Sequence, residues 1–420
     1  MHPELLTTVR SYSRKLFMAD LFAGLTVAMV ALPLSLAIAI ASGASPSEGL
    51  VTAIIGGVVI SALGGSSVQI GGPTGAFIVV VAGVIAAHGI DGLIIATLMA
   101  GLILLAAGLL RAGNLISLVP EAVVNGFTIG IAAVIATSQI KDLFGLVASK
   151  VPADFLGKLP VLWAARTSFS PSSFAIGLMT MILIVCLRRL APRWPGLILA
   201  VGLTSGLVVW LDLPVETIND RFGSLPNHLP LPHLPEVSAA RLQELFPSAI
   251  IIAFLAGVES LLSAIVADRM RGTQHRPNAE LLAQGYANIA SALFGGLPAT
   301  GAIARTATNI RAGGQTPVAG VIHALTLLAF VYLAAPLAGY LAMPALAGLL
   351  ILTAWNMAEP HHWPRYMRMR PSDQLLLVLT LVLTLLVDLS LAIGIGVALG
   401  LALRLRRRNV PPAEWDTPDR

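Results

Sequence analysis

The chain has 420 residues, of which 56% are hydrophobic and only 11% are charged. A soluble protein carries about 25% charged residues, so this composition excludes an ordinary soluble domain. The net charge of +5 does not indicate a nucleic-acid partner, because the basic residues stand at the ends of apolar runs, where membrane topology explains them.

Apolar runs of membrane-spanning length recur from Leu21 to Leu405 and predict an all-α polytopic membrane protein. Several of the predicted spans are short. The fourteen spans are centred near residues 31, 57, 80, 102, 131, 180, 203, 257, 287, 306, 325, 349, 380 and 398.

Two long connections, at residues 142–171 and 212–246, interrupt the spans, and the second is rich in proline. The second connection divides the spans into two sets of seven. We therefore predict a first repeat over residues 1–212, a connection over 213–246, a second repeat over 247–408 and a cytoplasmic tail over 409–420.

The basic residues sort to one side of this arrangement. An even number of spans puts both termini on the same side, and nineteen of the 26 lysines and arginines fall there. The positive-inside rule then predicts that both termini are cytoplasmic. Arg305 falls within a span, and the six basic residues on the other side are Lys141, Lys150, Lys158, Arg166, Arg221 and Arg241.

The segments SALGGSSVQIGGPTGAF (61–77) and SALFGGLPATGAIARTA (291–307) resemble each other and lie between the second and third spans of their halves. Because seven is odd, the second copy must have the inverted orientation in the membrane. Short segments interrupted by glycine and proline, at matching positions of two inverted halves, indicate a transporter binding site.

Both segments are suited to start a helix near the middle of the membrane, since Pro73 and Pro298 fit the first helical turn. Two such helices would direct their N-termini at each other and form an anion site. Glycines would let the backbone approach a ligand, or they only permit close helix packing. These glycines are Gly71, Gly72, Gly75 and Gly301.

Arg305 stands at a span centre, where an arginine costs about 2.5–3.5 kcal/mol on insertion scales. A bound anion would relieve this cost, so we interpret Arg305 as an anion ligand. The alternatives are that its side chain reaches the membrane surface or pairs permanently with an acid.

The candidate acid is Glu259, in the first span of the second half. A glutamate in an apolar span either pairs with a cation or carries a proton, and both fit a proton-coupled transporter. The alternative is a static bridge between Glu259 and Arg305.

The sequence contains no HExxH, CxxC, Walker A or GxSxG motif, and its eight histidines form no metal-binding spacing. We therefore expect no enzyme, no metal, no other cofactor and no ATP-driven pump. His323 lies within a span, and we interpret it as a packing residue rather than a proton relay.

Four segments resemble the SulP anion transporters, the solute carrier 26 family. The resemblance implies two intertwined inverted repeats of seven spans, a core of spans 1–4 and 8–11, and a gate of spans 5–7 and 12–14. It also implies a homodimer and an elevator-like movement of core against gate. The segments are DLFAGLTVAMVALPLSLAIAIASG (20–43), QIGGPTGAFIVVV (69–81), GAIARTATNIRAGGQTPVAG (301–320) and VDLSLAIGIGVALG (387–400).

The resemblance places the anion between the starts of spans 3 and 10, with span 1 lining the site and span 8 close by. The family commonly has glutamine and an aromatic residue where this chain has Leu34 and Ile38, which indicates a larger or organic anion. Glu259 resembles the acid of proton-symporting members. The implied substrate-binding residues are Leu34, Ile38, Thr74, Gly75, Ala304 and Arg305.

Family members usually continue into a cytoplasmic STAS domain, whereas this chain ends at LRLRRRNVPPAEWDTPDR, so we expect that domain to be absent or removed. The predicted function is proton-coupled symport of a C4-dicarboxylate across a bacterial inner membrane. The alternatives are a bicarbonate, sulfate or chloride transporter, an exchanger, an uncoupled anion channel, a nucleobase carrier, or a scaffold without transport activity.

Overall fold

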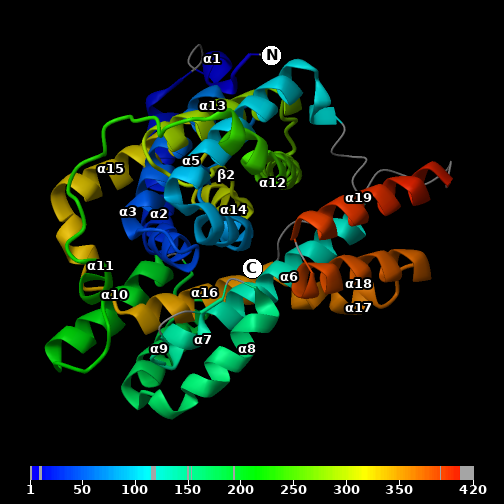
Figure 1. Cartoon of the computed structure of the whole chain (residues 1–420). Coiled ribbons are helices and arrows are strands. Elements are labelled where there is room, and N and C mark those ends of the chain that lie inside the picture. Colours follow the sequence, from blue (N-terminus) through cyan, green and yellow to red (C-terminus); the bar gives the residue numbers. More distant parts are fainter. Residues whose placement is uncertain are drawn as a thin grey trace.

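The computed structural model describes residues 2–8, 12–114, 120–148, 151–152, 154–192, 194–387 and 389–406. It is helical along most of this length (Figure 1). The predicted tail at 409–420 and Lys150 lie outside the described residues.

The membrane segments of the first half follow a short N-terminal helix, α1 (Glu4–Thr8). They are α2 (Arg14–Ala41), then α3 (Pro46–Val51) continued by η2 (Thr52–Gly56) and α4 (Gly57–Leu63), then η3 (Gly75–Phe77) continued by α5 (Ile78–Leu109), and finally α6 (Glu121–Ser138), α9 (Pro171–Leu190) and α10 (Gly196–Trp210).

The membrane segments of the second half are α12 (Ala239–Arg271), α13 (Pro277–Leu293), α14 (Ile303–Arg311), α15 (Val318–Ala338), α16 (Met343–Met357), α18 (Pro371–Leu386) and α19 (Leu389–Arg406). The connections hold short helices, namely α7 (Ile140–Leu143), α8 (Phe155–Ala164), η5 (Ala165–Ser168), α11 (Ile218–Phe222), η6 (Pro360–His362) and α17 (Trp363–Tyr366).

All fourteen predicted span centres fall on these helices. The centres near residues 80 and 102 share α5, which is broken at Gly89, where the backbone has a φ of 71°. Over the described residues, seven helical segments are long and apolar enough to cross a membrane by themselves. The other spans are short, and α14 has only nine residues. The backbone N–H and C=O groups at the ends of α14 therefore need hydrogen-bond partners from the surrounding protein.

Helix α12 begins at Ala239, within the range predicted for the connection at 213–246. The hydroxyl of Ser238 accepts a hydrogen bond from the backbone N–H of Arg241 over 3.2 Å, which caps the helix at this point. Pro247 therefore lies inside the helix rather than at its start.

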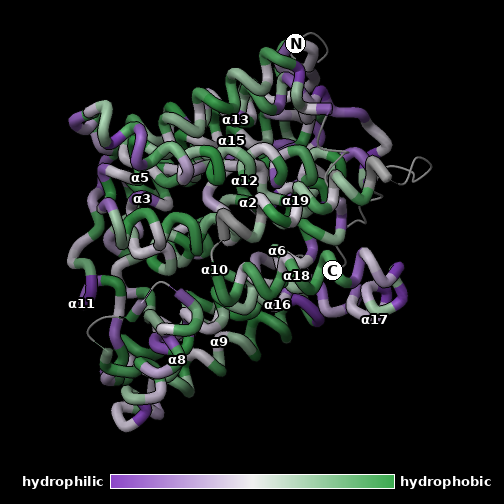
Figure 2. The backbone as a smooth tube through the Cα atoms, turned by 45° about the vertical axis from the view of Figure 1, so that its right-hand side comes forward, coloured by the Kyte–Doolittle hydropathy of each residue, from purple (hydrophilic) through white to green (hydrophobic). Residues whose placement is uncertain are grey.

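The helices form two groups, which Figure 2 shows as an upper and a lower body. In the core, α5 packs against α12 and α13, and α2 packs against α15. In the gate, α6 packs against α18, and α9 packs against α16. Each of these contacts joins helices from different halves of the chain, so the two repeats are intertwined as predicted.

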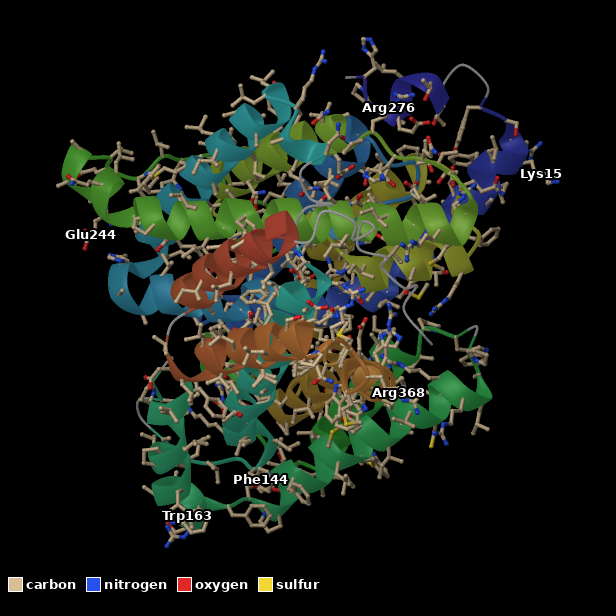
Figure 3. All side chains as sticks on the ribbon, turned by 90° about the vertical axis from the view of Figure 1, so that its right-hand side faces the viewer. Lys15, Phe144, Trp163, Glu244, Arg276 and Arg368 are labelled. Carbon is tan, nitrogen blue, oxygen red and sulfur yellow. The ribbon has the colours of Figure 1, made fainter. Side chains whose placement is uncertain are left out.

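Charged and aromatic side chains mark the two sides of the molecule (Figure 3). Lys15, Arg276 and Arg368 lie on one side, here called the basic side. Glu244 and Trp163 lie at the other, here called the opposite side. This arrangement agrees with the sorting of basic residues along the sequence.

Candidate functional site

The two repeated segments meet as a short antiparallel strand pair inside the protein. Strand β1 (Gly71–Gly72) pairs with β2 (Thr300–Gly301), with Gly71 opposite Gly301 and Gly72 opposite Thr300. All four residues are buried. Because lipid offers no hydrogen-bond partners at membrane depth, this pairing supplies partners for backbone that is not helical.

Each strand leads into a helix, so two helix starts lie beside the strand pair. The turn η3 begins at Gly75 and continues as α5, and α14 begins at Ile303. Free N–H groups and the positive end of the helix dipole are therefore present on both sides. The sequence repeat predicted two helix starts at this place, but Pro73 and Pro298 lie before the helices rather than in their first turns.

Two glycines of the strand pair, Gly72 and Gly301, leave space that side chains of the protein itself occupy. A Cβ atom on Gly72, where φ is 152°, would lie 2.2 Å from Nη1 of Arg305. A Cβ atom on Gly301 would lie 1.4 Å from Nε2 of Gln69. Both distances are far below contact, so these glycines admit Arg305 and Gln69 against the backbone.

The side chain of Arg305 is buried against this backbone, with 1% of the residue exposed. Its Nη2 atom donates to the carbonyl oxygen of Pro73 over 3.0 Å and to Oγ of Ser35 over 3.2 Å. Nε and Nη1 have no hydrogen-bond partner among the described residues. The side chain therefore does not reach the membrane surface, and part of its donor capacity is unused.

Glu259 lies on α12, and its side chain is partly buried. Its Oε2 atom accepts a hydrogen bond from the hydroxyl of Thr74 over 2.7 Å. No ion pair within 4.0 Å joins Glu259 to Arg305 in the described structure. The static bridge considered from the sequence is therefore not formed.

The remaining predicted site residues lie on α2, η3 and α14. Leu34 and Ile38 are buried on α2, and Ser35, which follows Leu34, brings this helix to Arg305. Ala304 is exposed. Gly75 faces the gate, since a Cβ atom there would lie 3.0 Å from Sδ of Met357 and 3.5 Å from Cδ1 of Ile135.

A buried polar network, which was not predicted from the sequence, lies beside the strand pair. Its centre is Glu280 on α13, which is 0% exposed. Oε1 accepts from Oγ of Ser260 over 2.9 Å and from Nε2 of Gln284 over 2.8 Å, and Oε2 accepts from the N–H of Gly65 over 3.0 Å. Gln69 donates to Oγ of Ser260 over 2.8 Å, so the network extends to the strand pair.

A second set of hydrogen bonds holds the segment before β1 to α14. The N–H of Ile70 donates to Oγ1 of Thr306 over 3.1 Å, and Oγ of Ser263 donates to the same atom over 3.1 Å. Nδ2 of Asn309 donates to the carbonyl oxygen of Val68 over 2.8 Å. The strand pair is thus fixed by side chains of α12 and α14.

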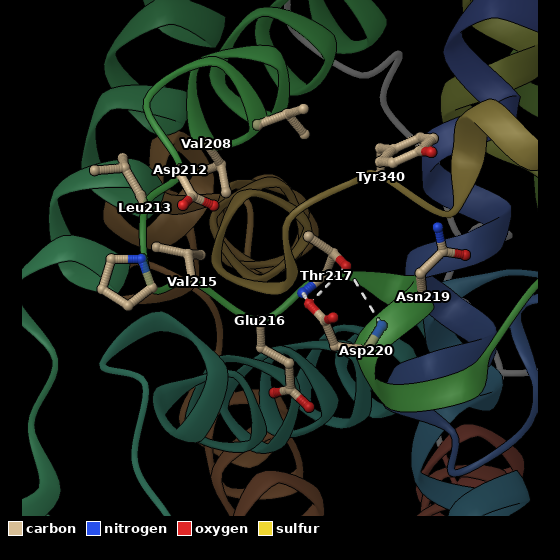
Figure 4. Close-up of a pocket in the computed structure, with 11 residues that line it drawn as sticks. Val208, Asp212, Leu213, Val215, Glu216, Thr217, Asn219, Asp220 and Tyr340 are labelled. Carbon is tan, nitrogen blue, oxygen red and sulfur yellow. Dashed lines mark hydrogen bonds between the residues drawn. The ribbon is translucent and has the colours of Figure 1, made fainter.

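Figure 4 shows a separate cavity of about 580 Å³, which contains none of the predicted site residues. Its lining includes Asp212, Glu216 and Asp220. Hydrogen bonds from Thr217 hold the pKa of Asp220 below its usual range. A cavity lined by carboxylates repels anions, so it is not a candidate for the anion site.

The model of the sulfate permease family matches residues 17–380. The chain belongs to this family. Its members are transporters and not enzymes, and the fourteen-span inverted-repeat fold is theirs.

Two relatives are similar over most of this chain. The putative sulfate transporter YvdB of Bacillus subtilis is 40% identical over 369 residues, which cover 88% of this chain and 70% of that protein. The bicarbonate transporter BicA of Synechocystis sp. is 34% identical over 342 residues, which cover 79% of this chain and 59% of that protein. The chain thus spans only part of the length of these relatives.

Solved structures show the same fold. The transmembrane domain of a cyanobacterial bicarbonate transporter BicA matches with a TM-score of 0.79 and 30% identity, covering 91% of this chain and 99% of that one. Murine Slc26a9, an anion transporter in the inward-facing state, matches with a TM-score of 0.87 and 17% identity, covering 97% of this chain and 72% of that one.

Proposed function

We propose that this protein is a secondary active transporter of a small oxyanion, with sulfate and bicarbonate as the first candidates. The observation that carries this proposal is the buried guanidinium of Arg305, whose Nε and Nη1 atoms have no partner in the described structure. A buried cation beside two helix N-termini is costly unless an anion is present. The relatives named as sulfate and bicarbonate transporters support the same class of substrate.

The proposed anion position lies between Thr74, Gly75 and Ala304, in front of the strand pair. Arg305 lies behind Gly72 and contributes a positive potential there. Met357 and Ile135 of the gate lie close to Gly75, which leaves little room and favours a small anion.

A C4-dicarboxylate is the second candidate. Leu34 and Ile38 present apolar side chains from α2, and such a wall suits the methylene carbons of an organic acid better than the oxygens of sulfate.

We further propose that Glu259 carries a coupling proton. It has no cationic partner within 4.0 Å among the described residues, and Thr74 connects it to the start of span 3. Protonation of Glu259 would remove a negative charge next to the anion and so favour joint entry of anion and proton.

The transport movement, the oligomeric state and the orientation of the protein in the membrane are also proposals. Movement of the core against the gate would carry the strand pair and its ligand across the membrane in an elevator-like step. We propose a homodimer in a bacterial inner membrane with both termini in the cytoplasm, supported by the bacterial relatives and by the basic side of the molecule.

The test is uptake of radiolabelled sulfate, bicarbonate and succinate by proteoliposomes, with and without an inward proton gradient. We expect accumulation of one of them that depends on the gradient and is abolished in Arg305→Ala. Arg166→Gln is the matched control, because Arg166 is exposed on the opposite side, where its side chain donates to the carbonyl oxygen of Trp163 and lies over the Trp163 ring. Absence of uptake of all three anions by the wild type would refute the proposal.

A further inference from the structure

Lys158 on α8 is a buried lysine outside the site described above. Only 6% of the residue is exposed, and Nζ donates to Oγ of Ser138 over 2.6 Å. An ammonium group has three N–H donors, and no second partner is present among the described residues. The group is therefore incompletely satisfied.

The charge of Lys158 also lacks a close counter-ion. No carboxylate oxygen of the described residues lies within 4.0 Å of Nζ. Asp154, one turn earlier, accepts from the N–H of Gly157 over 2.6 Å and so caps the start of α8. Burial lowers the pKa of Lys158, and the negative charge of Asp154 offsets this only in part.

The hydroxyl that Lys158 contacts lies on a defined face of gate helix α6. At about 100° per residue, Ser138 is within about 20° of Ile131 and about 60° of Ile135 around the helix. Ile135 is the residue whose Cδ1 atom lies close to Gly75 at the start of span 3. Ser138 follows it by about 4.5 Å along the axis, towards the opposite side.

Helix capping does not account for this lysine. In the last turn of α6, the carbonyl oxygens of Ile135 and Ala136 already accept from the N–H of Gln139, each over 3.2 Å. The ammonium contacts a side-chain hydroxyl instead of these carbonyl groups. Among the described residues, the ammonium therefore has that hydroxyl as its only hydrogen-bond partner.

We propose that Lys158 binds the transported anion at the end of the path on the opposite side, before the anion reaches the strand pair. This inference rests on the proposed function. An anion there would supply the missing counter-charge and accept the unused N–H donors, and charge-assisted hydrogen bonds of this kind are strong. Separation of core from gate on this side would open the face of α6 that carries Ser138.

The experiment compares initial rates of radiolabelled sulfate, bicarbonate and succinate uptake in membrane vesicles of the two opposite orientations. In Lys158→Met we expect the KM to rise by about tenfold when the anion enters from the opposite side, with no change from the basic side. Lys158→Arg keeps the charge and should stay close to the wild type. Arg166→Gln removes one positive charge from the same connection. It should leave the KM unchanged for entry from either side.

An equal change of KM from both sides, or a loss of thermal stability in Lys158→Met without a change in KM, would assign Lys158 a structural role and overturn the inference. An unchanged KM from both sides would overturn it as well. In each of these cases the proposed function stands, because the wild type transports. A wild type that carries none of the three anions refutes both proposals together.

Discussion

The hydroxyl of Thr74 donates to Oε2 of Glu259 over 2.7 Å, and this bond joins the start of span 3 to the middle of span 8. The neighbouring carbonyl oxygen, of Pro73, accepts from Arg305. One peptide unit therefore lies between the proposed proton carrier and the buried cation. A change of charge at Glu259 would be transmitted to the anion position through Thr74.

Replacement of Thr74 by valine removes the donor and keeps the shape of the side chain. We expect transport at low substrate concentration to fall by about tenfold, because a hydrogen bond to a charged group is worth about 1.5–3 kcal/mol. Thr74→Ser retains the hydroxyl and should retain most of the activity. Equal losses in the two variants, measured as initial uptake rates, would argue against a role for this bond.

Glu259→Gln removes the titratable group and leaves a carbonyl oxygen that can accept from Thr74. We expect the variant to lose accumulation driven by a proton gradient while it still exchanges anion for anion. The measurement compares uptake at acidic and neutral external pH, with a protonophore as the control. Persistent dependence on the gradient in this variant would exclude Glu259 as the proton carrier.

Gly301→Ala tests the close packing of the strand pair. The new methyl group would lie 1.4 Å from Nε2 of Gln69, so Gln69 or the strand must move. Such overpacking costs about 1–3 kcal/mol, and the apparent Tm in detergent should fall. Gly83→Ala is the matched control, since a Cβ atom there meets nothing within 4 Å and alanine favours the helix, so the Tm should not fall.

Glu280→Ala removes the acceptor at the centre of the buried network. Ser260, Gln284 and the N–H of Gly65 would each lose a partner, and a buried unsatisfied group costs about 1–3 kcal/mol. We expect a marked fall in Tm. Glu244→Ala, at an exposed glutamate of α12, should leave the Tm within error, and a similar effect of both substitutions would contradict the assigned role of Glu280.

Most of the fold could be predicted from the sequence, because the physics of a membrane span is local. An apolar run of sufficient length predicts a membrane span without knowledge of its neighbours. All fourteen predicted span centres lie on helices. The repeat at 61–77 and 291–307 also indicated which segments meet. The start of α12 lies within the range predicted for the connection, because its cap at Ser238 lies outside the apolar run.

The contacts of the candidate site were harder to predict, because they depend on which side chains meet across the two halves. Arg305 is bound by Ser35 and Pro73 rather than by an acid, and nothing in the local sequence of α14 indicates this. Glu280 could have been found from its spacing, since Glu280, Gln284 and Asn288 recur every four residues on one face of α13.

The antiparallel pairing of β1 with β2 has a consequence for the order of assembly during synthesis. Gly71 and Gly72 enter the membrane long before Thr300 and Gly301 leave the ribosome. Until then, the first half holds backbone N–H and C=O groups without their final partners, next to the place that Arg305 will occupy. The core therefore cannot be completed one half at a time, and the nascent first half must be sheltered by water, lipid headgroups or the insertion machinery until the second half arrives.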